Sequence, residues 1–151
     1  HVRSRRQRQM CIRDRDAGLD VYLPATANGL AWLAAVTDER ALELLSQHGM
    51  DQAKRMGPGA PQTLREVLER IDQTRQRGHA TVFDAYEQGT SAMAAVVCAS
   101  THGAPIATVS IAGPSVRMTP ERMEALAPDL LACAKALGAT SGQSPLFASV
   151  N

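Results

Sequence analysis

Two strand-like segments separated by a short turn constrain the fold of this chain most strongly. The first, SAMAAVVCAS, ends at residue 100, and the second, IATVSIA, begins at residue 106. Two strands joined by so short a turn must pair antiparallel, because a parallel pair requires a long crossover connection. A shorter strand-like segment, HATVF, precedes them at residues 79–83. The sequence therefore predicts an antiparallel sheet at the centre of the fold.

The side chains of both long segments alternate in size, so the two faces of the sheet should differ. In the second segment one face carries Ala107, Val109 and Ile111, and the other carries Ile106, Thr108, Ser110 and Ala112. In the first segment the small residues Thr90, Ala92 and Ala94 alternate with Ser91, Met93, Ala95 and Val97. A face of small side chains accommodates either a closely packed helix or a ligand cavity.

Helix-capping residues mark three helices before the strands. Thr26, Thr37 and Thr63 are the expected N-caps, and the helices should extend to about residue 35, to Gly49 and to Gly78. The third has a capping box, since glutamate follows its N-cap threonine by three residues. Its expected buried stripe is Leu64, Val67, Leu68 and Ile71.

A fourth helix should follow the strands. Thr119 and Pro120 open it, and it extends to about residue 137 with a kink or restart at Pro128. Three helices, three strands and a last helix are typical of an α+β fold, and we expect the helices to lie on one side of the sheet.

Composition excludes several classes of protein. Aromatic residues make up only 3% of the 151 residues, so aliphatic side chains must fill the core. No apolar run approaches the roughly 20 residues of a membrane span. Cys11, Cys98 and Cys133 are odd in number and lack the spacing of metal ligands, which indicates reduced thiols. We therefore expect a soluble, cytoplasmic protein with no metal and no cofactor.

The first 15 residues differ from the remainder of the chain. They hold six arginines and one acid, a charge of +5 within a formal net charge of +1, so residues 16–151 carry −4. A basic arm can bind nucleic acid, but this one has no aromatic residues for stacking. The string RSRRQRQMCIRD also resembles translated sequencing-adapter sequence. We expect residues 1–15 to be a non-native or disordered tail, residues 16–138 to form the domain, and residues 139–151 to be a flexible C-terminal tail.

From residue 23 to residue 137 the chain resembles the effector-binding domain of the IclR family of bacterial transcription regulators. VYLPATANGLAWLA is similar to the family segment L-P-x-x-A-T-A-x-G-x-A-x-L-A, with its Leu-Pro shifted by two places. IDQTRQRGHA, QGTSAMAAVV and ATVSIAGPSVRMT are similar to I-R-x-x-G-Y/H-A, x-G-x-x-x-I-A-A-P-V and A-x-L-S-V-S-G-P-x-x-R-x-T. The segments occur in the family's order and at its spacing.

The resemblance implies a GAF-like, profilin-like antiparallel sheet with helices packed on it, and a cavity that binds a small organic acid. It also implies a homodimer or homotetramer that binds operator DNA through an N-terminal winged helix-turn-helix. We expect that DNA-binding domain, and the first strands of this domain, to be missing from the chain, with residue 16 as the truncation point. No membrane, cofactor or enzymatic activity is implied.

The resemblance also assigns candidate ligand-binding residues. Backbone amides in the turn that matches Ala27, Asn28 and Gly29 should approach the ligand carboxylate, as the free amides of a helix start can do. The other matching positions are Val21, Val82, Thr90, Ala92, Ser110 and Ala112. Val82 replaces an acid, Ala92 a cysteine and Ala112 a serine of the glyoxylate- and pyruvate-binding members. We therefore expect an aromatic or branched carboxylic acid as the effector.

Two residue pairs suggest catalysis instead. Cys98 and His102 could supply a nucleophile and a base, and Asp84 and Glu87 could serve as paired carboxylates. A buried cysteine beside a turn histidine, and a solvated acidic loop, explain the same residues without chemistry. No nucleophile, base and oxyanion-binding group can be assembled from the motifs, so no catalytic residue is expected.

The histidines, Trp32 and Met93 are also considered as candidate site residues. His48, His79 and His102 are scattered without the spacing of zinc ligands, so no metal site is expected. Trp32 and Met93 fall within apolar stripes and are expected in the core. Three classes of function remain: a ligand-sensing domain, a ligand-free oligomerisation module, and a small hydrolase or isomerase on a GAF-like scaffold.

Overall fold

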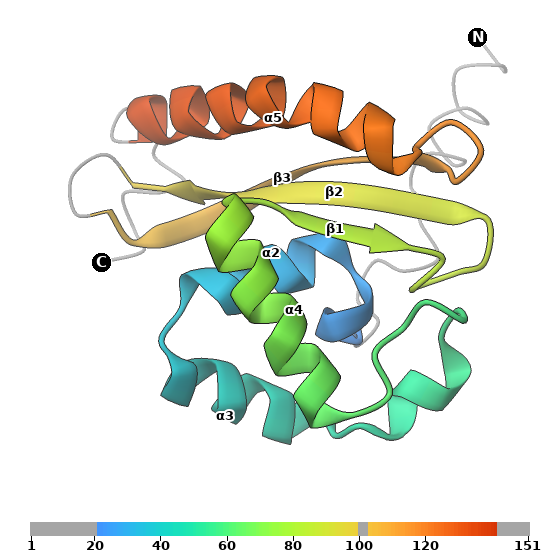
Figure 1. Cartoon of the computed structure of the whole chain (residues 1–151). Helices are drawn as coiled ribbons and strands as arrows, with labels where there is room; N and C mark the ends of the chain where they lie inside the picture. Colours follow the sequence, from blue (N-terminus) through green and yellow to red (C-terminus); the bar gives the residue numbers. More distant parts are fainter. Residues whose placement is uncertain (1–20, 100–102, 142–151) are drawn as a thin grey trace, which may run out of the picture.

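A three-stranded antiparallel sheet lies between two layers of helices in the computed structural model, which describes residues 21–99 and 103–141 (Figure 1). The strands are β1 (Ala80–Phe83), β2 (Thr90–Cys98) and β3 (Pro105–Pro114), with β2 in the middle. Both β1 with β2 and β2 with β3 pair antiparallel. The predicted antiparallel sheet and the α+β class are thus confirmed.

The register of β2 and β3 brings their small residues onto one face. Ala92 pairs with Ala112 and Ala94 pairs with Ser110, so these four side chains share that face. Ile106 departs from the predicted alternation and packs with the residues of the opposite face. The register shifts between Val97 and Cys98, and such an irregularity changes the direction of the side chains beyond it.

One layer contains the helices that precede the sheet. It consists of a 3₁₀ turn η1 (Leu23–Ala25), α2 (Ala27–Ala35), α3 (Asp38–His48), a second 3₁₀ turn η2 (Asp51–Arg55) and α4 (Leu64–Arg77). Thr26, Thr37 and Thr63 cap α2, α3 and α4 with their side-chain oxygens, as predicted. Glu66 completes the last cap by accepting the amide of Gln62 at 2.7 Å.

The buried stripe of α4 is narrower than predicted. Val67 and Ile71 are 0% and 2% exposed, whereas Leu64 and Leu68 are 44% and 40% exposed. The helix packs on α2 and β1 through residues spaced by four and then three positions, a stripe that ends with Thr74. Leu64 and Leu68 therefore lie beside the contact rather than within it.

The second layer is a single long helix. α5 (Pro120–Thr140) covers the opposite face of the sheet, so the prediction that all helices lie on one side is wrong (Figure 1). Both faces of β2 and β3 carry apolar residues, and each must be covered. α5 is also continuous through Pro128, without the predicted restart. Pro128 is on the exposed side, where the freed carbonyl of the preceding turn can bond to water.

The sheet divides the interior into two apolar clusters. Met93, Ala95 and Val97 pack with residues of α5, including Met123 and Leu130. The other cluster joins the opposite side of the sheet to the helices of the first layer. The backbone of α5 lies very close to the end of β2 at Gly138, where a Cβ would overlap the carbonyl oxygen of Cys98.

Candidate functional site

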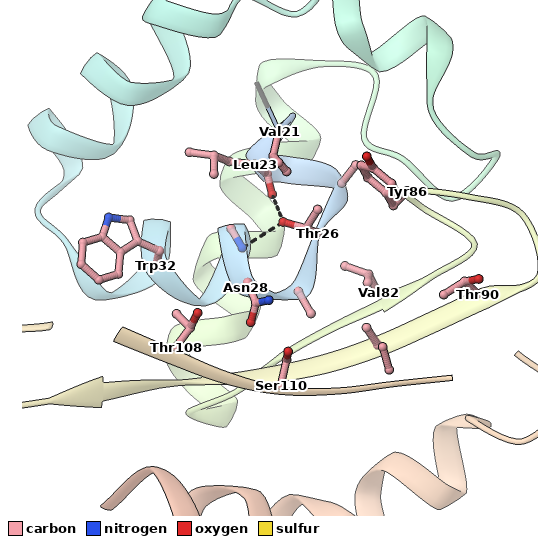
Figure 2. Close-up of a pocket in the computed structure, with 15 residues that line it drawn as sticks. Val21, Leu23, Thr26, Asn28, Trp32, Val82, Tyr86, Thr90, Thr108 and Ser110 are labelled. Carbon is pink, nitrogen blue, oxygen red and sulfur yellow. Dashed lines mark hydrogen bonds between the residues drawn. The ribbon is translucent and has the colours of Figure 1, made fainter. Parts of the chain in front are cut away.

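A cavity of about 720 Å³ lies between the first helical layer and the small-residue face of the sheet (Figure 2). The start of α2 and its preceding 3₁₀ turn form one wall, and the three strands form the other. The residues that line it are Val21, Leu23, Ala25, Thr26, Ala27, Asn28, Gly29, Trp32, Val82, Tyr86, Thr90, Ala92, Thr108, Ser110 and Ala112. All nine residues predicted for the ligand site therefore line one cavity.

Close packing of the 3₁₀ turn on α2 shapes the helical wall. The Thr26 hydroxyl donates to the carbonyl oxygen of Leu23 at 3.2 Å and accepts the amide of Gly29 at 3.0 Å (Figure 2). A Cβ on Gly29 would overlap the Leu23 carbonyl oxygen. Glycine at position 29 is thus required by the turn that packs against it.

The amides at the start of α2 are not equally available. Gly29 donates its amide to its own N-cap, so this group is already bonded. Ala27 and Asn28 occupy the first two positions of the helix, where amides have no partner within the helix. These two amides, rather than all three predicted ones, are suited to approach an anion.

The sheet wall is formed by small side chains. Ala92, Ser110 and Ala112 lie on adjacent strands, and Val82 of β1 continues the same surface. The side chain of Asn28 extends from α2 toward Thr108 and Ser110 of β3 (Figure 2). Small residues on both walls keep the space open, and the polar groups gather where Asn28 faces β3.

Two aromatic side chains lie at opposite ends of the cavity. Trp32 lies at the end formed by α2, and Tyr86 lies at the other end, to which Thr90 also belongs (Figure 2). Neither aromatic residue was predicted for this site. The prediction that Trp32 lies in the core is wrong, whereas Met93 is fully buried as predicted. Trp32 follows Asn28 by one helical turn, so it presents its ring on the same face of α2.

Four further lining residues were also missed. Leu23 and Ala25 belong to the sequence segment that resembles the family motif, and Thr26 was identified only as a helix cap. Thr108 lies two residues before Ser110 on the same strand, so the alternation of β3 could have identified it.

The cavity contains no formal charge among the described residues that line it. Its polar groups are hydroxyls, the Asn28 amide and the backbone of the first turn of α2. A helix N-terminus carries partial positive charge and free amides, which favour an anionic group. The arrangement can hold an apolar body with one anionic end.

Asp84 and Glu87 do not form a catalytic pair. The Asp84 carboxylate accepts the Ser115 hydroxyl at 2.6 Å and the Gly89 amide at 2.8 Å, and these hydrogen bonds hold its pKa below its usual range. Ser115 in turn accepts the hydroxyl of buried Ser91 at 2.8 Å, since its own proton is donated to Asp84. Asp84 thus connects the β1–β2 loop to the end of β3, and Glu87 is exposed.

Neither a cysteine–histidine catalytic pair nor a metal site is found among the described residues. Cys98 is exposed at the end of β2, and its possible partner His102 lies outside the described residues. His79 is buried and bonds to the carbonyl oxygen of Arg77, with Nδ1 at 3.2 Å. Among the described residues no group of three or more histidines, cysteines or acids is placed to hold a metal ion.

The fold and the family of this chain agree with those of known proteins. The fold is that of GAF-like α+β regulatory domains with a cavity between a sheet and a helix. Residues 3–139 match the family model described as the bacterial transcriptional regulator IclR C-terminal domain. This chain therefore belongs to the IclR family of bacterial transcriptional regulators.

Individual relatives agree with this assignment. The chain is 31% identical over 99 residues to the transcriptional repressor IclR of Escherichia coli K12, a match that covers 66% of this chain and 35% of that protein. The chain thus spans about a third of that curated relative. The C-terminal domain of the E. coli regulator KdgR has a TM-score of 0.68 at 26% identity, with 78% of this chain and 69% of that chain covered.

A third relative was solved with a ligand. It is a double mutant of the inducer-binding domain of PobR from Acinetobacter, in complex with 3-hydroxybenzoic acid. Its TM-score is 0.68 at 25% identity, with 77% of this chain and 66% of that chain covered. The described residues of the present chain include no helix long and apolar enough to cross a membrane.

Proposed function

We propose that this domain senses a small aromatic or branched carboxylic acid in the cavity between α2 and the sheet. The observation that carries the proposal is the convergence of nine residues, from separate segments of the sequence, on one cavity. A volume of about 720 Å³ lies within the range of small-molecule sites in proteins.

The polar groups suggest where the carboxylate binds. The amides of Ala27 and Asn28, the Asn28 side chain and the Ser110 hydroxyl all border the cavity between α2 and β3. A carboxylate there would gain several hydrogen bonds and the favourable end of the helix dipole. Buried hydrogen bonds to a charged group are among the stronger ones in proteins.

The remainder of the cavity favours an apolar body. The side chains of Val82, Ala92 and Ala112 line the cavity and offer no hydrogen bond. The resemblance implies polar side chains at these positions in the glyoxylate- and pyruvate-binding members of the family. Trp32 and Tyr86 provide aromatic walls at the two ends (Figure 2). An aromatic acid would bury more apolar area than glyoxylate or pyruvate, at roughly 25 cal/mol per Å² before ordering costs.

The wider biological role follows from membership of the family and is part of the same proposal. The domain would belong to a longer cytoplasmic regulator that binds operator DNA through an N-terminal winged helix-turn-helix and assembles as a homodimer or homotetramer. Members of the IclR family are transcriptional regulators rather than enzymes, which disfavours the hydrolase or isomerase alternative.

Calorimetry on the full chain tests the ligand. We expect benzoate and 3-hydroxybenzoate to bind more tightly than glyoxylate, and to raise the melting temperature because they bind only the folded form. Ser110→Ala should weaken all acids by about 1 kcal/mol or somewhat more. Ala112→Ser should shift preference toward smaller, more polar acids.

A matched control is Ser46→Ala, which removes an exposed hydroxyl that bonds within α3, away from the cavity. It should leave every affinity unchanged. Tighter binding of glyoxylate than of benzoate would contradict the proposed ligand class. Absence of binding by any acid, with a folded chain, would favour the ligand-free oligomerisation module.

A further inference from the structure

A second cavity of about 270 Å³ is lined mainly by residues of α4 and of β1, which is an edge strand of the sheet. The residues that line it are Leu30, Gly59, Arg70, Gln73, Thr74, Arg77, His79, Thr81 and Phe83. None of them lines the larger cavity. The two cavities are therefore separate sites with different chemistry.

Cationic side chains from one face of α4 converge on this second cavity. Arg70 and Arg77 are seven residues apart, which places them two helical turns apart on the same face, with Gln73 between them. Among the described residues no ion pair joins either arginine to a carboxylate, and no acidic residue lines the cavity. The cavity thus concentrates positive charge.

Arg70 is held in place by a hydrogen bond to the backbone. Its Nη2 donates to the carbonyl oxygen of Gly59 at 2.8 Å, which orients the guanidinium and leaves other N–H groups for a ligand. Burial lowers its pKa, an effect that the neighbouring Glu66 opposes. The Glu66 carboxylate, however, caps the start of α4 by accepting the amide of Gln62 at 2.7 Å.

The imidazole of His79 also lines this cavity. The side chain is only 6% exposed, and its Nδ1 lies 3.2 Å from the carbonyl oxygen of Arg77. A carbonyl oxygen only accepts, so Nδ1 must donate its proton in this bond. Nε2 is therefore the ring nitrogen that takes no part in this bond.

We propose that this cavity binds a phosphate group, as free phosphate or as a small phosphate ester. Two guanidinium groups, with the side-chain amide of Gln73 between them on α4, supply several N–H donors, which suit the several oxygens of a tetrahedral dianion better than the two of a carboxylate. Arginine is well suited to phosphate because its planar N–H groups can bond two oxygens at once. The site goes beyond the proposed acid-sensing function and does not depend on it.

Calorimetry of the full chain with inorganic phosphate, at fixed pH and ionic strength, tests the proposal. We expect saturable binding at one site per chain that benzoate does not displace. Glycerol phosphate is titrated as a second ligand. Tighter binding of glycerol phosphate would indicate a phosphate ester as the natural ligand, and tighter binding of inorganic phosphate would indicate free phosphate. Binding of neither phosphate nor ester by the folded chain would overturn the proposal.

Two charge-matched variants localise the site. Gln73→Glu places a carboxylate in the cavity, whereas Gln76→Glu adds the same charge to an exposed position of α4 that does not line it. We expect the first to weaken phosphate binding at least about tenfold and the second by less than about twofold, since a like charge nearby disfavours an anion. Equal effects of the two variants would assign the binding to net charge and contradict the site.

Removal of a cation provides an independent check. Arg77→Gln should also weaken binding about tenfold, because it removes a charged donor from an exposed residue at the end of α4. Arg65→Gln is its control, since Arg65 is on the same helix and pairs with Glu69 at 2.9 Å outside the cavity. Unchanged affinity in Arg77→Gln would rule out the proposed arginine contact.

Discussion

Adjacent residues of β2 lie in opposite environments. Met93 is fully buried under α5 in an apolar cluster with Met123 and Leu130, whereas Ala92 borders the larger cavity on the other side of the sheet. The same contrast continues on β3, where Val109 and Ile111 pack with the α5 cluster and Ser110 and Ala112 line the cavity. One sheet therefore has a filled face and a face with open space.

The difference between the two faces is a difference in side-chain volume. Strand geometry directs alternate residues to opposite sides, so side chains can be chosen independently for each face. Large side chains on the α5 face fill the space under that helix, whereas small ones on the other face leave unfilled space beside α2. Stability and ligand capacity should consequently depend on different residues of the same strands.

The largest expected effect is on the filled face. Met93→Ala should lower the free energy of unfolding by about 2–5 kcal/mol, because it removes buried apolar contacts and leaves a void under α5. Urea denaturation monitored by circular dichroism measures the change.

Ala92→Val is the matched control on the adjacent residue. It adds methyl groups to open space, so the free energy of unfolding should change by less than about 1 kcal/mol while acid binding weakens. A large loss of stability in this variant, or a small one in Met93→Ala, would contradict the division between the two faces.

Two glycines provide a second comparison, one on each side of the sheet. In Gly29→Ala the new methyl group would overlap the Leu23 carbonyl oxygen, and in Gly138→Ala it would overlap that of Cys98. Each change should cost about 1–3 kcal/mol of stability, as overpacking against backbone generally does. Only Gly29→Ala should also reduce affinity for the proposed acid, because it displaces a wall of the cavity. Equal loss of affinity in both variants would show that the two sides are coupled.

The smallest expected effect concerns acid stability on the α5 side of β2, where Ser91 bonds to Ser115 and Ser115 bonds to Asp84. Hydrogen bonds from Ser115 and Gly89 lower the pKa of folded Asp84. The unfolded chain thus takes up this proton at a higher pH than the folded chain, so the contribution is present above about pH 4 and is lost as pH falls further.

Asp84→Asn should make stability less dependent on pH below about pH 4, with urea midpoints measured at several pH values. Asparagine tolerates the left-handed backbone at this position, where φ is 49°, so the fold should be retained. Asp129→Asn, an exposed position of α5, is the control and should retain the pH dependence. The same acid profile in Asp84→Asn as in the unmodified chain would exclude this network as its source.

Local features of the fold could be predicted from the sequence. The caps of α2, α3 and α4 depend on a threonine hydroxyl and an amide three residues away, so the relevant residues are close in the chain. The nine cavity residues were identified by resemblance to the family. The alternation of small residues on the strands left open whether a closely packed helix or a cavity lies on that face, and the register of β2 and β3 brings those residues together.

Features that depend on tertiary packing could not be predicted. Helical spacing does not distinguish Trp32 in a cavity wall from a core residue, because both lie on an apolar stripe. Leu64 and Leu68 belong to the same stripe as Val67, but the area of α4 in contact with α2 and β1 is too narrow to bury them. Ile106 changes side at a register shift that simple alternation does not contain.

The alternation along β3 has a mechanical consequence for the whole domain. One side of β3 lines the cavity and the other packs against α5, so a shift of the strand backbone at Ser110 would also move Val109 and Ile111. α5 has 21 residues and is about 30 Å long, so tilting it at the sheet moves its far end further. A ligand that shifted the backbone of β3 on entering the cavity would therefore also move α5, although α5 does not line the cavity.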